Sequence, residues 1–194
     1  MKKITLKRLV VCSGVFLISL MLITALAAAS TKNRLTVPNS VKDSSVCQTD
    51  VASLLALIIN ERARVGSPAL TIDPALAASA HNKLADEVAG QYYGHNLLDG
   101  SSTGAFIRSQ GVNAAWGEDL DVNALTPTID WSSFKASAAH YASLTDPQYT
   151  RVGIAEQCVD LTIKASTGPD DNSNLIGVPV KELTVVHLAA PERD

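Results

Sequence analysis

The sequence predicts an α+β domain, because segments with helical periodicity come first along the chain and most strand-like segments come late. Apolar residues recur at helical spacing over 51–65 and 74–91, whereas 150–159 and 183–190 are predicted to be strands. This order differs from the regular strand–helix alternation that is typical of a parallel βαβ fold. We therefore expect helices packed on a separate sheet.

The first two helices are predicted from their capping residues. Asp50 is placed to cap a helix that begins at Val51 and is ended by Gly66. Asp73 is followed by Pro74, and a capping residue before a proline is a strong signal for a helix start. We expect the second helix to run to the segment Tyr92 to His95, which ends it.

The later elements are shorter and are separated by turn residues. In order, we expect a short helix over 105–110, an extended segment over 112–120, a loop over 123–130, a helix from a cap at Ser132 or Ser133 to Leu144, and strands over 150–159, 161–164 and 183–190. On the helix that ends at Leu144, Phe134, Ser137 and His140 lie three apart, hence on one face.

The amino-terminal 29 residues are predicted to be a secretory signal peptide. Four basic residues precede an apolar run over 9–26, and three alanines follow it. The apolar run is about long enough to span a bilayer, so an uncleaved membrane anchor is the alternative. We expect a linker over 30–46 and one domain over 47–194.

Composition and charge narrow the function. The chain has 194 residues, of which 46% are hydrophobic, so one domain with a real core is expected. Removing residues 1–29 takes away four cations and no anions, which changes the net charge from −3 to −7. Nucleic acid and anionic membrane surfaces call for a basic patch, so neither is expected as the main partner. We expect a secreted monomer, outside the cell or in the cell envelope, unless the anchor tethers it.

Two cysteines lie outside the predicted signal peptide, Cys47 and Cys158. In an oxidising compartment such a pair is expected to form a disulfide, although two separate buried thiols are the alternative. On the chain-entropy model, a bridge across this separation stabilises the fold by roughly 4–5 kcal/mol.

The candidate functional residues are His95, Glu118, Ser137 and His140, which we expect to share one cleft. Neutral imidazoles and a carboxylate suit a divalent ion such as zinc, with His95 and His140 as ligands and Glu118 as a third ligand or as an orienting acceptor. A hydrogen-bonded cluster that only braces the cleft is the alternative.

Hydrolysis is the competing hypothesis for the same cleft. Ser137 and His140 are close enough in sequence to hydrogen-bond, and Glu118 is a candidate base for metal-assisted hydrolysis. The sequence has no Gly-x-Ser-x-Gly elbow, so Ser137 is more readily explained as a capping or packing residue. We therefore assign no catalytic residue and favour a protein that is not an enzyme.

An ordered set of motifs over about residues 50–191 resembles the CAP superfamily, which comprises cysteine-rich secretory, antigen 5 and pathogenesis-related 1 proteins with SCP-like extracellular domains. The motifs are Leu57 to Arg64, Leu70 to Leu76, Tyr93-Gly94-His95, Asp99-Gly100, Gly117-Glu118-Asp119, Phe134-x-x-Ser137-x-x-His140, Tyr149 to Ala155 and Val185 to Pro191.

The resemblance implies a three-layer α-β-α sandwich with a small, mostly antiparallel central sheet. It also implies a cleft to which His95, Glu118 and His140 contribute, with Ser137 at the position of the bacterial serine. Asp119 stands in place of the usual asparagine, which is expected to add negative charge beside Glu118. A glutamate that completes the cleft in eukaryotic relatives has no counterpart between Glu118 and His140.

The resemblance further suggests a non-catalytic binding module for a sterol, a fatty acid or another small apolar ligand, or for an extracellular or cell-envelope component. Four aromatic residues near the cleft are candidates for ligand contacts, with packing in the core as the alternative. They are Tyr92, Tyr93, Phe106 and Trp116.

Overall fold

The computed structural model describes residues 46–170 and 172–192. The predicted signal peptide over 1–29 and nearly all of the predicted linker over 30–46 lie outside the described residues. The helices are α1 (Val51–Val65), α2 (Pro74–Gly90), α3 (Thr103–Ser109), α4 (Pro127–Ala136), α5 (Ala138–Thr145) and the 3-10 helix η1 (Ser173–Leu175). None of the helices in the described residues is long and apolar enough to cross a membrane.

The strands form two sheets. They are β1 (Thr71–Ile72), β2 (Tyr92–Gly94), β3 (Trp116–Val122), β4 (Arg151–Thr162), β5 (Ala165–Thr167) and β6 (Pro179–Ala189). The larger sheet has the order β1-β4-β6-β3, in which β1 pairs in parallel and the other neighbours are antiparallel. The smaller sheet is a parallel pair of β2 and β5.

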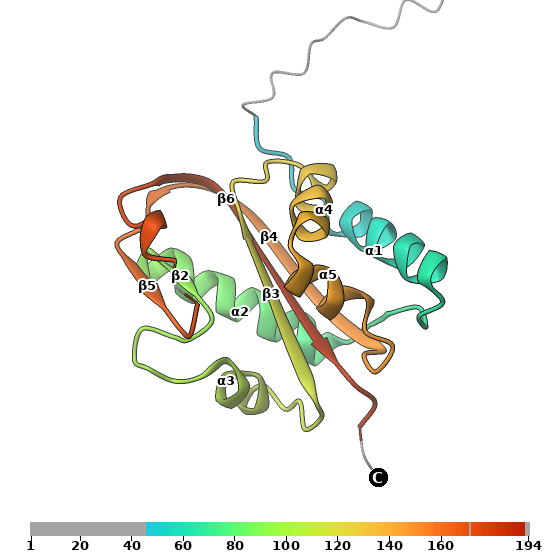
Figure 1. Ribbon diagram of the computed structural model, residues 1–194. Helices are drawn as coiled ribbons and strands as arrows, with labels where there is room; N and C mark the ends of the chain where they lie inside the picture. The colour runs from blue at the N-terminus through green and yellow to red at the C-terminus, as the bar shows by residue number, and fades with distance from the viewer. Residues whose placement is uncertain (1–45, 171, 193–194) are drawn as a thin grey trace, which may run out of the picture. The chain divides into compact units, whose positions relative to one another are not determined.

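Helices cover both faces of the larger sheet, which confirms the predicted α+β class and the three-layer arrangement (Figure 1). On one face, α1, α4 and α5 bury a core that includes Leu54, Ile58 and Phe134 against Val186 of β6. On the other face, α2 packs its apolar stripe, including Leu84, against β3, β4 and β6. The predicted stripe along residues 74–91 is therefore the face that contacts the sheet.

The two predicted helix starts are confirmed. The Asp50 side chain accepts a hydrogen bond from the backbone N–H of Ser53, and Gly66 ends α1 in the left-handed conformation with φ 81°. The Asp73 side chain accepts from the first backbone N–H groups of α2, and Pro74 is its first residue. These local signals mark where both helices start, because a cap acts through neighbouring backbone groups.

Three local predictions were wrong. The predicted loop over 123–130 contains the start of α4, because Thr126 caps a helix with Pro127 at its first position. The predicted continuous helix to Leu144 is broken at Ser137, which has ψ 117° and caps α5 with its own side chain. The segment after α2 is the strand β2 and not a helix end, because it pairs with β5, which no local signal indicates.

The carboxyl end of α5 is tied to α1 by one buried cation. Arg62 is fully buried, and its guanidinium donates to the backbone carbonyls of Pro68, Leu144, Asp146 and Tyr149 at 2.6–3.1 Å. A guanidinium presents five donors in a fixed fork, so several carbonyls satisfy it without a carboxylate. This contact fixes the helix that carries His140.

The predicted disulfide is confirmed. Cys47, just before α1, is bonded to Cys158 of β4, and their Cα atoms are 5.8 Å apart. The bond attaches the start of the helical layer to the sheet. Structural disulfides of this kind are typical of proteins that fold in an oxidising compartment.

Candidate functional site

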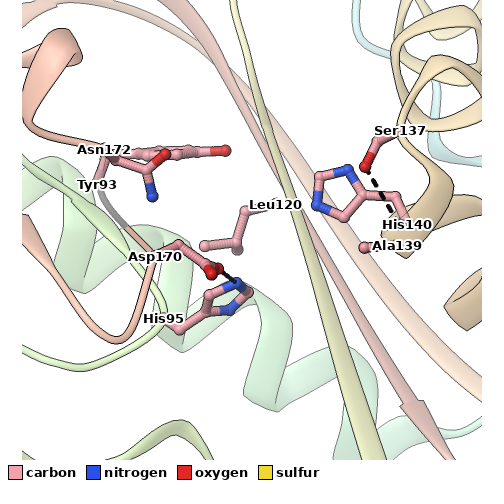
Figure 2. A pocket seen from close by; sticks show the side chains of 8 residues that line it. All are labelled: Tyr93, His95, Leu120, Ser137, Ala139, His140, Asp170 and Asn172. Atoms are coloured by element: carbon pink, nitrogen blue, oxygen red, sulfur yellow. Dashed lines mark hydrogen bonds and ion pairs between the residues drawn. The ribbon is translucent and has the colours of Figure 1, made fainter.

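His95 and His140 line one pocket of about 290 Å³, although they come from distant parts of the chain (Figure 2). His95 follows β2, and His140 lies in the first turn of α5. The remaining lining residues are Tyr93, Leu120, Ser137, Ala139, Asp170 and Asn172. The structure thus places three of the four predicted cleft residues in the pocket wall, with Glu118 behind His95.

Both ring nitrogens of His95 face carboxylate oxygens. Nδ1 is 2.7 Å from Oε1 of Glu118. Nε2 is 3.0 Å from Oδ2 of Asp170, a contact that Figure 2 shows. The hydrogen bond with Glu118 raises the pKa of His95, against the opposing effect of burial. A ring whose two nitrogens both donate to carboxylates carries a proton on each, so His95 favours the imidazolium form.

Glu118 lies behind His95 and is satisfied on both oxygens. Oε1 accepts from His95 and from the hydroxyl of Thr103 at 3.0 Å, and Oε2 accepts from Nε2 of His187 at 2.7 Å. Burial by itself raises the pKa of Glu118, but the hydrogen bonds from His187 and His95 outweigh it and lower the pKa to about 2. Glu118 is therefore a fixed anion that orients His95.

His187 is a member of the site that the sequence did not reveal. It is fully buried on β6, directly opposite Glu118 in the sheet register, and its Nδ1 is 3.0 Å from the hydroxyl of Ser79 on α2. The chain of contacts from Ser79 through His187 and Glu118 ends at His95, on the pocket wall. The only sequence signal was a histidine inside a predicted core strand, where a buried ring needs polar partners.

His140 differs from His95 in its surroundings. Its ring packs edge-to-face on Phe134, with ring centroids 5.4 Å apart and planes at 86°. Burial, and then the positive charge of His95, lower the pKa of His140. The pocket therefore pairs an imidazole that favours the protonated form with one that favours the neutral form.

Ser137 acts as a helix cap. Its hydroxyl oxygen accepts a hydrogen bond of 3.4 Å from the backbone N–H of His140. In the described part of the chain, no hydrogen bond joins this hydroxyl to the imidazole ring of His140. The geometry thus matches the capping role that the sequence analysis preferred.

The backbone before His95 is held by α2 and by β5. Gly94 has φ 144°, and a Cβ atom there would lie 1.8 Å from the carbonyl oxygen of Thr167, so no side chain fits. The buried ammonium of Lys83 donates to the carbonyl of Gly94 at 2.7 Å and to Glu87 at 3.0 Å. These contacts place His95 against Glu118 on a rigid base.

Asp119 does not line the pocket, although the charges of His95 and Glu118 act on it. It points to the opposite face of β3 from Glu118, where it accepts a hydrogen bond of 2.9 Å from the hydroxyl of Ser143. Burial is the main cause that raises its pKa to about 7. A residue next to Glu118 in sequence is thus separated from it by the pleat of the strand.

A metal site in this pocket stays a prediction. Among residues 46–170 and 172–192, no group of three or more His, Cys, Asp or Glu side chains is arranged so that it could hold a metal ion. Both oxygens of Glu118 are used by imidazoles, so its geometry suits the orienting role better than that of a ligand. The two imidazoles on the pocket wall, His95 and His140, are the remaining donors of the predicted set.

The four aromatic residues predicted to contact a ligand differ in burial and in their position relative to the pocket. Tyr92 is fully buried and receives a hydrogen bond from Lys83, so it belongs to the core. Tyr93 is 7% exposed and lines the pocket, whereas Phe106 and Trp116 are partly buried outside it. Tyr93 is therefore the one of the four that the pocket brings near the imidazoles.

Comparison with known proteins gives a consistent family signal. The model of the cysteine-rich secretory protein family, CAP, matches residues 55–160. No curated protein sequence matches the chain. The family match covers more than half of the sequence and includes His95, Glu118 and His140.

Solved structures show the same fold at low sequence identity. An extracellular protein with an SCP domain from Bacillus anthracis has TM-score 0.55 and 18% identity, over 72% of this chain and 40% of that one. An outer surface protein of Borrelia burgdorferi has TM-score 0.54 and 15% identity, over 75% and 98%. A cysteine-rich secretory protein of Staphylococcus aureus has TM-score 0.50 and 14% identity, over 71% and 37%. The chain thus spans less than half the length of the Bacillus anthracis and Staphylococcus aureus proteins.

Proposed function

Since the chain belongs to the cysteine-rich secretory protein family, CAP, we propose that it is an exported, non-catalytic binding module whose pocket takes the polar end of a small apolar or lipid ligand. The observation that carries this proposal is the pair of unlike imidazoles on one pocket wall. Nε2 of His95 can donate to a carboxylate or hydroxyl oxygen of a ligand once the ligand displaces the exposed Asp170, and a neutral His140 both donates and accepts.

The pocket offers fewer contacts for the apolar part of the ligand than for its polar end. Tyr93 and Leu120 line the pocket and are 7% and 3% exposed, and Leu120 lies between the two histidines (Figure 2). They offer a narrow apolar floor for the first carbons of a ligand, and the rest of the chain of such a ligand extends out of the pocket. A fatty acid fits this description because its charge is confined to one end.

Displacement of a fluorescent fatty acid, cis-parinaric acid, tests this function in the purified protein. We expect His140→Ala to weaken binding by about tenfold, which corresponds to roughly 1.4 kcal/mol for one hydrogen-bonding group at a charged headgroup. His81→Ala is the matched control, because His81 is exposed on α2 and lies outside the pocket. Equal affinities of the two variants, or no binding by the unmodified protein, would count against the proposal.

We propose in addition that the pocket takes one divalent ion such as zinc through His95 and His140, with Glu118 orienting the ring of His95. Nε2 of His95 must exchange its proton and the contact with Asp170 for the ion, so affinity rises with pH. Calorimetric titration with zinc chloride at pH 6 and pH 8 tests this. His95→Ala combined with His140→Ala should abolish binding and His81→Ala should keep it; equal binding by both would refute the metal site.

A further inference from the structure

A second group of acidic side chains, three of them buried and Glu156 partly buried, lies on the face of the sheet that α4 covers, opposite to Glu118. Asp121 of β3 and Glu156 of β4 both pair with Thr184 of β6, so the three residues form one row across the sheet. Glu182 lies two residues before Thr184 on the same strand, and Asp130 of α4 lies over the row, where the charges of Asp121, Glu156 and Glu182 act on it. We name Asp121, Asp130, Glu156 and Glu182 the carboxyl cluster.

The carboxyl cluster is short of hydrogen-bond donors. Asp130 is 2% exposed and Asp121 8% exposed. Within the described residues, Oδ1 of Asp130, Oδ2 of Asp121 and Oε1 of Glu156 are buried without a hydrogen-bond partner. A buried carboxylate oxygen with no donor is costly, and several together repel one another.

The donors that do reach the carboxyl cluster come from backbone and hydroxyl groups. The N–H of Asp50 donates to Glu156 at 2.7 Å, and the N–H of Ala124 donates to Glu182 at 3.0 Å. The hydroxyl of Thr184 also donates to Glu182, and the N–H of Val122 donates to Asp121 at 2.8 Å. Burial raises the pKa of Asp121 and of Asp130, and hydrogen bonding by the side chains of Ser133 and Thr184, respectively, opposes this larger effect. None of these contacts brings a positive charge.

The charged groups around the carboxyl cluster are themselves acidic. Its members come from α4, β3, β4 and β6, and α1 adds Asp50, whose charge acts on Glu156. The nearby lysines on these elements are engaged elsewhere: Lys135 of α4 reaches Glu61 and Trp131, and Lys181 of β6 pairs with Asp160. Protons are therefore the simplest neutralising partners, because these lysines pair with other acids.

We propose that the carboxyl cluster is a pH-sensitive contact that holds α4 on the sheet while it is protonated, and that loss of its protons loosens α4 and, through Ser137, the helix that carries His140. A carboxyl group that keeps its proton carries no charge, so protonation removes the repulsion between neighbouring members of the carboxyl cluster. The effect on the pocket follows from continuity, because α4 ends at Ala136 and Ser137 is shared with α5.

The ionisation of the carboxyl cluster agrees with this geometry. Burial, and then the charges of Glu182, Asp121 and Glu156, raise the pKa of Asp130 from 3.8 to about 8. Burial is also the main cause that raises the pKa of Glu182 from 4.5 to about 7. A carboxyl whose pKa is higher in the folded protein than in the unfolded chain stabilises the fold at low pH. That contribution is lost as the pH rises from about 4 to about 8.

Thermal unfolding of the disulfide-bonded protein between pH 5 and pH 8 tests the proposal. We expect the Tm of the unmodified protein to fall by about 5 °C over this range because of the carboxyl cluster. Asp130→Asn and Glu182→Gln, which are neutral at every pH, should each remove a large part of the fall and raise the Tm at pH 8. Asp160→Asn, at an exposed carboxyl that pairs with Lys181, is the matched control and should keep the full fall.

Hydrogen exchange supplies a readout that a purely structural role would not move. The amides of α4 in the unmodified protein should gain protection at pH 5 relative to pH 8 after correction for intrinsic rates, and those in Asp130→Asn should not. Other groups also titrate in this range, including Glu87 and Asp119, so the difference between variant and control is the quantity measured. A Tm fall that neither neutral variant reduces would overturn the proposal. A second result would also overturn it: calcium chloride raises the Tm of the unmodified protein at pH 8, and Asp130→Asn abolishes that rise. This result would identify the carboxyl cluster as a cation site.

Discussion

Glu118 and Asp121 lie three residues apart on β3 and are almost equally buried, at 9% and 8% exposed. Their pKa values are nevertheless shifted in opposite directions. Two imidazoles donate to Glu118, and its pKa falls to about 2. Asp121 faces other carboxyls, one of its oxygens has no partner, and burial raises its pKa. Burial alone therefore does not set the charge of an acidic side chain, because the groups that share its face of the sheet decide the sign.

The same contrast holds for the regions around these two residues. On the pocket side, each of these buried acids has a buried nitrogen donor: Glu118 has His187, and Glu87 has Lys83, although burial still raises the pKa of Glu87 to about 7. On the α4 side, the acids of the carboxyl cluster have backbone donors and one another. Removing the charge of Glu118 or Lys83 should therefore destabilise the fold, whereas removing the charge of a member of the carboxyl cluster should stabilise it.

The largest effect is expected for Glu118→Gln. The glutamine cannot accept from both His95 and His187, so a buried ring nitrogen loses its acceptor, and we expect a loss of about 4 kcal/mol in the free energy of unfolding. Because the folded pKa of Glu118 lies below its ordinary 4.5, the contribution is complete above pH 4.5 and lost as the pH falls towards 2.

Urea unfolding at pH 7 and pH 3 measures this effect. The difference in unfolding free energy between Glu118→Gln and the unmodified protein should be smaller at pH 3. A variant that is as stable as the unmodified protein at pH 7 would show that Glu118 is not the organising anion of the pocket.

The next largest effect is expected for Lys83→Met. Lys83 is fully buried and donates to Glu87, to the Tyr92 hydroxyl and to the carbonyl of Gly94. Its loss leaves Glu87 without its base, and we expect a loss of about 3 kcal/mol in urea unfolding at pH 7. The double variant with Glu87→Gln should recover part of that loss; a double variant that loses the sum of the two single effects would disprove the pairing.

A smaller effect of opposite sign is expected for Asp121→Asn. The asparagine oxygen still accepts from the N–H of Val122, and its amide hydrogens face the remaining carboxyls. We expect a gain of about 1 kcal/mol in the free energy of unfolding at pH 8 and little change at pH 5. A loss of stability at pH 8 would mean that the charge of Asp121 is compensated after all.

The smallest effect concerns the two pocket histidines. Replacing His95 by Gln removes the positive charge that acts on His140, so the pKa of His140 should rise towards its ordinary 6.5. Titration of the imidazole protons by NMR measures this shift, and His81→Gln is the control that should leave His140 unchanged. A His140 titration that does not respond to His95→Gln would mean that the two rings are not coupled across the pocket.

Much of the fold was predictable from local sequence signals. Asp50 and the pair Asp73-Pro74 mark the starts of two helices, because a cap acts through neighbouring backbone groups. The order of elements predicted the α+β class, because helical and strand-like periodicity can each be recognised within a single segment. By contrast, the spacing of Phe134, Ser137 and His140 suggested one helix, and the break at Ser137 depends on how α4 and α5 pack on the sheet.

The site was predictable only in part. The resemblance to a family placed His95 and His140 in one pocket, which the structure shows as well. His187 and the carboxyl cluster were missed because their partners lie far away in sequence and meet through strand register. His187 contacts Glu118, 69 positions earlier, and Glu156 meets Asp121 across Thr184. No periodicity within one segment carries that information.

The central position of β6 has a consequence for the order of assembly. In the larger sheet, β6 lies between β4 and β3, although it is the last strand of the described chain. During synthesis or translocation from the amino terminus, Cys47 and Cys158 are both delivered before β6 emerges. The covalent bridge can thus precede the sheet, whereas Glu118 waits for His187, so functional assembly is completed only when the carboxyl-terminal segment arrives.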